Sequence, residues 1–181
     1  PVQMIQQQGL FYNPYNTFFN FPAMVEMQYT FVSLLSPASQ TISPKTLHWL
    51  YFVLTALLLA HITKRFFQKY NKSWTVPIFV STPFVPIISG WAFVEMAITF
   101  YVLVGLYIVL LLREEKQVKP LLLLLGIILG ALLGMKYSML AIIPVFILIS
   151  GFALWKYYKK IFIQGLCYLG LFLFLVSIPW F

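Results

Sequence analysis

Long apolar runs alternate with short polar breaks along most of the chain, from about residue 46 to residue 181. A helix needs about 20 mostly apolar residues to cross a bilayer, and the runs are close to that length. The pattern therefore predicts an all-α fold, a polytopic transmembrane bundle of about six helices. The expected spans are about 46–63, 74–91, 92–112, 120–135, 137–155 and 161–181.

The second run differs from the others because it contains Pro77, Pro83 and Pro86. Membrane helices tolerate proline where neighbouring groups satisfy the backbone carbonyls that lose a donor. Three prolines so close together favour a bent or partly broken segment over a straight helix.

Residues 1–45 form the sizeable polar stretch of the chain, with Gln and Asn interleaved among aromatic residues. We interpret this stretch as part of an extracytoplasmic loop, followed by the bundle at 46–181. The segment from Ala23 to Leu35 is too short to span a bilayer. It is expected to form a short helix that lies against the membrane or the bundle.

The distribution of basic residues along the chain tests the assignment of six spans. Ten of the twelve Lys and Arg residues lie in the breaks at 64–73, 113–119 and 156–160, and the other two are Lys45 and Lys136. Strict alternation of six spans puts these three breaks on one side, and positive charge concentrates on the cytoplasmic side of membrane proteins. The loop at 1–45 and the turns near 90–95 and 134–138 are therefore expected outside.

Composition narrows the class further. The chain is 61% hydrophobic and only 9% charged, whereas soluble domains have about 25% charged residues. This excludes an ordinary soluble domain, a disordered chain and a disulfide scaffold, since Cys167 is the single cysteine. The net charge of +8 is explained by cytoplasmic loops, so no nucleic-acid partner is expected. No phosphate loop, serine–histidine–acid pattern or zinc spacing occurs.

Two acidic residues on the expected outer side are candidates for a site. Glu95 lies between the second and third runs, and Glu26 lies in the short helix. Glu95 has two interpretations that the residues leave equally open, a carboxylate at a helix N-terminus and a binding or catalytic carboxylate in a cavity. For Glu26, contact with an outer cavity competes with a solvated helix face.

Lys136 is the basic residue that breaks the charge asymmetry within the later runs. It either extends its amine to the outer headgroups or binds an anionic group such as the phosphate of a lipid carrier. Gly126, Gly130 and Gly134 recur every four residues before it. Small residues at this spacing allow close helix packing, which favours an inward-facing site slightly.

The two histidines, His48 and His61, are thirteen residues apart. This separation does not suit a shared metal site, so packing or interfacial roles are the more common interpretation. No metal ligand is assigned.

Four stretches, taken in order, resemble the GT-C superfamily of membrane glycosyltransferases, which includes the protein O-mannosyltransferases and the lipid A aminoarabinose transferase. They are Phe11 to Met27, Thr82-Pro83 followed by Trp91 to Ala97, Gly126 to Ser138, and Pro179-Trp180. The resemblance covers nearly the whole chain, although each motif alone is weak. Where many members have Asp, this chain has Glu95.

The resemblance implies a transferase that uses a polyprenyl-phosphate sugar donor and a glycan, lipid or protein acceptor. It implies a bacterial cytoplasmic (inner) membrane location with the active site facing outward. Glu95 would be a supporting catalytic acid, and Lys136, Tyr137 and Glu26 would bind substrate. Some members need a divalent cation, which the residues leave open.

The family's principal acid lies early in the first outer loop, and residues 1–45 contain no Asp. We therefore expect the chain to be an internal piece of a longer protein that begins after this acid. The alternatives are a piece of a multi-spanning transporter and a non-catalytic membrane subunit.

Overall fold

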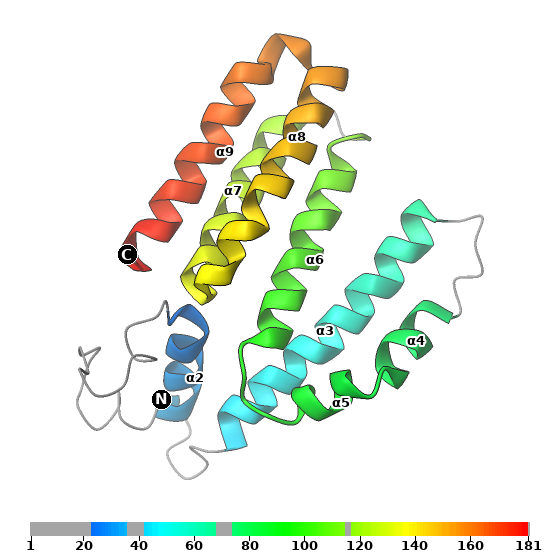
Figure 1. Cartoon of the computed structure of the whole chain (residues 1–181), viewed down its shortest axis with the longest axis vertical. Helices are drawn as coiled ribbons and strands as arrows, with labels where there is room; N and C mark the ends of the chain where they lie inside the picture. The colour runs from blue at the N-terminus through cyan, green and yellow to red at the C-terminus, as the bar shows by residue number, and fades with distance from the viewer. Residues whose placement is uncertain (1–22, 36–41, 68–73, 115–116, 181) are drawn as a thin grey trace. The chain divides into compact units, whose positions relative to one another are not determined.

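The computed structural model describes residues 23–35, 42–67, 74–114 and 117–180, which form helices and no strand. Figure 1 shows the helices along the chain. The α-helices are α2 (Met24–Leu35), α3 (Ile42–Phe66), α4 (Thr75–Ser81), α5 (Phe84–Ser89), α6 (Glu95–Leu111), α7 (Val118–Met135), α8 (Ile143–Tyr157) and α9 (Phe162–Ser177). The 3₁₀ turns are η4 (Tyr137–Ala141), η5 (Lys159–Ile161) and η6 (Ile178–Trp180).

Four helical segments are long and apolar enough to cross a membrane, which confirms the all-α membrane fold. They are Ile42–Phe66, Val118–Met135, Tyr137–Tyr157 and Lys159–Trp180, and the apolar helix α6 is slightly shorter. Many large apolar side chains on these segments are exposed, for example Leu57, Leu148 and Ile163. Lipid accommodates such side chains and water does not, so the described chain is that of an integral membrane protein.

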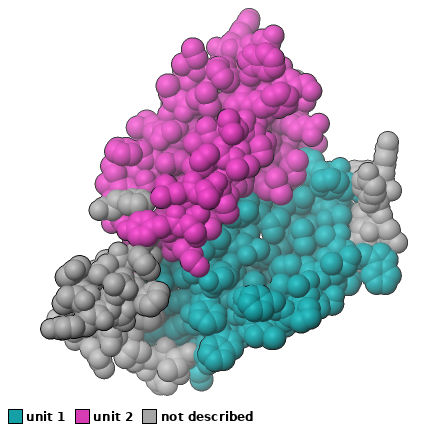
Figure 2. All heavy atoms as spheres, in the orientation of Figure 1, with its two compact units in different colours: residues 1–20, 25–103 teal, residues 21–24, 104–181 magenta. Residues whose placement is uncertain are grey.

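The chain divides into two compact units, which Figure 2 colours separately. Unit 1 comprises residues 1–20 and 25–103, and unit 2 comprises residues 21–24 and 104–181. Helix α6 begins in unit 1 and continues into unit 2. Each unit is described by itself.

In unit 1, α3 is the long helix and the α4–α5 segment returns along it. Phe52 of α3 stacks on Phe79 of α4, with ring centroids 5.8 Å apart. Helix α3 begins at Ile42, four residues before the expected boundary. Pro44 is the third residue of this helix, where its missing N–H costs no intrahelical hydrogen bond. The expected short helix is confirmed as α2.

The second apolar run is broken, as its prolines indicate. Helix α4 ends at Ser81 and α5 begins at Phe84. Thr82, between them, is extended with φ −64° and ψ 112°, because a residue that precedes proline is pushed out of the helical region. The run at 74–91 is therefore two short helices, and six crossings remain a prediction.

Unit 2 is built on the contact between α7 and α9, which run in the same direction. Gly126 lies against Leu169, and Gly130 lies against Leu173. The core face of α7 is fully buried over Leu122, Leu125, Leu129 and Leu132. The glycine stripe thus allows the close helix packing that the sequence predicts.

Candidate functional site

A buried polar cluster joins three segments of unit 1. The Tyr29 hydroxyl of α2 lies 2.7 Å from Nδ1 of His48 in α3. The same hydroxyl donates a 2.5 Å hydrogen bond to the carbonyl oxygen of Phe93, just before α6. Tyr29 and His48 are both buried, and their rings meet edge to face. One phenol therefore connects α2, α3 and the entry to α6.

The hydrogen-bond partners determine which atoms of this cluster carry protons. A phenol has one O–H, and a carbonyl oxygen can only accept, so Tyr29 donates to Phe93. The His48 ring then donates Nδ1–H to the Tyr29 oxygen. Nε2 is buried without a hydrogen bond of good geometry within the described part of the chain, and the backbone of Ile88 is the polar group that interacts with this ring. A buried polar atom in this state is costly unless a further group reaches it.

Glu26 lies one helical turn before Tyr29 on α2 and also has a buried carboxylate oxygen. Its Oε2 is buried without a hydrogen-bond partner among the described residues. Burial raises the pKa of Glu26, and the charge of Glu95 raises it further. Burial also raises the pKa of the Tyr29 phenol. The neighbourhood therefore disfavours additional negative charge.

Glu95 is the first residue of α6, as the helix-terminus interpretation predicts. Its Oε2 accepts a 3.1 Å hydrogen bond from the backbone N–H of Val94. Its charge also acts on Glu26 and Tyr29. The two acids that the sequence singles out thus share one electrostatic neighbourhood, and a binding or catalytic role for Glu95 stays a prediction.

A second polar contact holds α2 against α3. Tyr51 of α3 donates a 2.5 Å hydrogen bond to the side-chain carbonyl of Gln28. The Tyr51 ring also packs against Phe100 and Tyr101 of α6, with centroids 5.8 and 6.3 Å away. Together with the Tyr29 contacts, this fixes the helix that carries Glu26.

Lys136 and Tyr137 belong to unit 2. Lys136 follows α7 in an extended conformation, and Tyr137 begins η4. Both side chains are exposed. Glu95 belongs to unit 1, so a common substrate site for Glu95 and Lys136, as the resemblance implies, remains a prediction.

Two of the motif stretches meet inside unit 2. A Cβ added at Gly134 would lie 2.6 Å from Cδ1 of Trp180. The glycine-rich stretch before Lys136 and the Pro179-Trp180 stretch are therefore packed together at one end of the α7–α9 pair. The part of the first motif stretch that precedes Ala23 lies outside the described residues.

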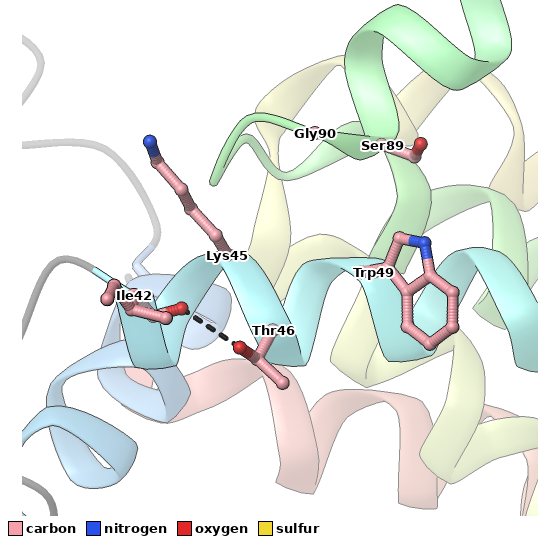
Figure 3. Close-up of a pocket in the computed structure, with 6 residues that line it drawn as sticks. All are labelled: Ile42, Lys45, Thr46, Trp49, Ser89 and Gly90. Carbon is pink, nitrogen blue, oxygen red and sulfur yellow. Dashed lines mark hydrogen bonds between the residues drawn. The ribbon is translucent and has the colours of Figure 1, made fainter. Parts of the chain in front are cut away.

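An open pocket of about 270 Å³ lies beside the start of α3. Figure 3 shows its lining, which runs along α3 and across to Ser89 and Gly90 at the end of α5. Thr46 donates to the carbonyl of Ile42, and Ser89 donates to the carbonyl of Pro86. Both hydroxyl protons are already used within the chain, whereas Lys45 and Trp49 of the same lining carry further N–H donors.

The sequence did not single out Tyr29 as a site residue, and it indicated only a packing or interfacial role for His48. The available signal was a titratable ring inside an apolar run, which requires a hydrogen-bond partner when it is buried. The described ranges contain no group of three or more His, Cys, Asp or Glu side chains that could hold a metal ion.

Comparison with known proteins adds no assignment, because no family model, curated protein or solved structure matches the chain. The fold itself defines the class, an all-α integral membrane protein. Its unit 1 contains a buried Tyr29–His48 pair, with Glu26 one helical turn away on α2. Any assignment of activity rests on this cluster and on the sequence motifs.

Proposed function

We propose that the chain is part of a membrane glycosyltransferase of the cell envelope. It would transfer a sugar from a polyprenyl-phosphate donor to a glycan, lipid or protein hydroxyl outside a bacterial inner membrane. The bond between the sugar carbon and the donor phosphate breaks, and a bond to the acceptor oxygen forms. The acceptor proton passes to a carboxylate base, and polyprenyl phosphate leaves.

The observation that supports this proposal best is the buried, unpartnered Oε2 of Glu26 within the described residues. A sugar or acceptor hydroxyl can occupy this oxygen without displacing an existing hydrogen bond. The carboxylate accepts such a bond when ionised and donates one when protonated. Glu95 supports the site by acting on the charge of Glu26. Glu26 is thus a substrate-binding group and Glu95 a supporting acid.

Lys136 and Tyr137 would contact the donor phosphate. An ammonium group acts as a flexible point charge toward phosphate, and it stabilises the charge that develops on the leaving group. Tyr137 adds a phenol next to it. The motif order and the Gly134–Trp180 contact support this role, because they hold the turn that carries both residues.

The test measures sugar transfer from a polyprenyl-phosphate donor by the intact protein in reconstituted membranes. A charged hydrogen bond is worth about 1.5–3 kcal/mol, and each 1.36 kcal/mol changes a rate tenfold. Lys136→Ala should therefore reduce transfer about ten- to a hundredfold at limiting donor, and Lys136→Arg should retain more. Lys45→Ala is the matched control, an exposed lysine expected on the same side, and it should transfer normally.

Glu26→Gln tests the carbohydrate contact, because it keeps the shape and removes the charge. It should raise KM for one substrate more than it lowers kcat. Glu95→Gln should also lower the rate of sugar transfer, because it removes the charge that acts on Glu26. If Lys136→Ala, Glu26→Gln and Glu95→Gln all transfer at the normal rate with normal protein levels, the site assignment is wrong.

One observation favours a second candidate, a piece of a transporter. Helices α4 and α5 are separated at Thr82 and Pro83, and discontinuous helices mark substrate sites in secondary transporters. Solute uptake into proteoliposomes distinguishes the two functions. Uptake without formation of a glycosylated product would favour the transporter.

A further inference from the structure

The end of unit 2 that is remote from Lys136 gathers positive charge around exposed aromatic rings. Helices α6 and α8 run side by side, since a Cβ at Gly105 would lie 3.0 Å from the Phe146 ring. Their C-terminal ends therefore lie at one end, as Figure 1 shows. Arg113, just after α6, interacts with the hydroxyl of Tyr157, the last residue of α8.

Two cations converge on this phenol from different helices. Arg113 approaches its hydroxyl, and the Lys156 ammonium lies 5.3 Å from the Tyr157 ring centroid. Next to them, the Lys159 ammonium lies 5.8 Å from the Trp155 ring centroid. The guanidinium and the ammonium repel each other, and an anion between them would remove this repulsion.

The balance of charge at this end remains positive. Glu114 is the acid there in the part of the chain that the structure describes, and Glu115 and Lys116 lie outside that part. The described basic residues at the same end are Arg113, Lys119, Lys156, Lys159 and Lys160. One acid cannot neutralise five cations, so an external anion has a net attraction to this end.

The position of these residues relative to the membrane indicates which kind of anion they would bind. Trp155 and Tyr157 are exposed at the end of an apolar helix, and such aromatic rings lie at the level of the lipid headgroups. Tyr157 can accept hydrogen bonds from the cations and still donate its own O–H. A phosphate oxygen accepts all three donors. Basic sites between helix ends bind anionic lipid headgroups in this way.

We propose that Arg113, Lys156 and Tyr157 bind the phosphate of an anionic phospholipid between the ends of α6 and α8. The lipid is one whose headgroup carries no compensating cation, such as phosphatidylglycerol. A zwitterionic lipid would place its own ammonium near Arg113 and Lys156 and would be disfavoured. This site is independent of the proposed glycosyl transfer.

The test uses the intact protein in detergent micelles and in nanodiscs. Native mass spectrometry measures bound phosphatidylglycerol against phosphatidylcholine. The double variant with Arg113→Gln and Lys156→Gln should bind phosphatidylglycerol about tenfold more weakly, as expected for the loss of charged hydrogen bonds. Tyr157→Phe should bind it more weakly than the wild type but better than the double variant. Binding of phosphatidylcholine should not change.

Lys119→Gln is the matched control for the single variant Lys156→Gln, because it removes one positive charge at the same end but outside this group. It should keep the lipid preference. An equal loss in Lys119→Gln would show diffuse surface attraction and would overturn the proposed site. Unchanged binding in the double variant, with its helical circular dichroism intact, would also overturn it.

Inorganic phosphate provides the second arm of the test. It should fail to displace phosphatidylglycerol at millimolar concentration, because the acyl chains hold the lipid at the bilayer edge of α8. Displacement by inorganic phosphate would show a site for free anions and would contradict the lipid assignment.

Discussion

Enlarging Gly130 should separate α7 from α9. A Cβ at this position would lie 2.7 Å from the Leu173 carbonyl oxygen and 2.7 Å from Cβ of Val176. Both distances are well inside the 3.4 Å at which ordinary contact begins. Neither atom can move aside by a side-chain rotation, because one belongs to the backbone and the other is the Cβ of its residue. The α9 backbone itself would have to shift.

Overpacking of this kind costs about 1–3 kcal/mol, or about 5- to 160-fold in the ratio of folded to unfolded protein. Gly130→Ala should therefore unfold at a lower denaturant concentration than the wild type. The assay is an unfolding titration with sodium dodecyl sulfate in mixed micelles, followed by circular dichroism. Gly134→Ala should cost less, because its neighbour is the Trp180 ring, which can rotate.

Gly170→Ala on α9 is the matched control. Nothing lies within 4 Å of a Cβ at Gly170, and alanine favours a helix over glycine by up to about 1 kcal/mol. This variant should be as stable as the wild type or more stable. If Gly130→Ala and Gly170→Ala unfold at the same denaturant concentration, the close contact between α7 and α9 does not contribute to stability as expected.

Three further predictions concern unit 1 and the topology. Burial raises the pKa of Glu26 above 4.5, so its contribution to stability is complete below about pH 4.5 and is lost as pH rises through the raised value. Glu26→Gln should remove this loss, which unfolding titrations between about pH 4 and pH 8 will show. Tyr29→Phe should destabilise the protein by about 1–3 kcal/mol, since it leaves buried groups unpaired. Its cost in a double-mutant cycle should fall when His48 is already alanine, and full additivity would contradict the contact. In a Cys167→Ser background, single cysteines at Asn71 and Lys116, both outside the described residues, should resist an impermeant thiol reagent in intact cells. Labelling without permeabilisation would reverse the orientation.

The sequence predicts the helices of this protein well because apolar runs set their extent directly. It predicts the break in the second run but not its place. Pro77 and Pro86 are each the third residue of a short helix, where no hydrogen-bond donor is needed. Only Pro83 coincides with the break, because Thr82 before it is extended. Choosing among three prolines requires knowing where each helix begins, and this depends on tertiary contacts.

The candidate site is harder to predict, because its contacts join residues that are far apart in the chain. Glu26 and Glu95 stand out as isolated acids, but their common neighbourhood is set by the fold. Tyr29 reaches His48 nineteen residues later and Phe93 sixty-four residues later. No periodicity encodes such a pairing, and a tyrosine near a membrane is typical of an interfacial belt.

His48 nevertheless carries a constraint that can be read without a structure. A ring nitrogen inside an apolar run loses its hydration, and an unpaired polar atom there costs more than most packing contacts supply. Such a histidine therefore predicts a donor or acceptor near the same end of its helix. In this chain the partner is Tyr29, and it accounts for Nδ1 only. The buried Oε2 of Glu26 is the atom of this neighbourhood that the proposed substrate hydroxyl would reach.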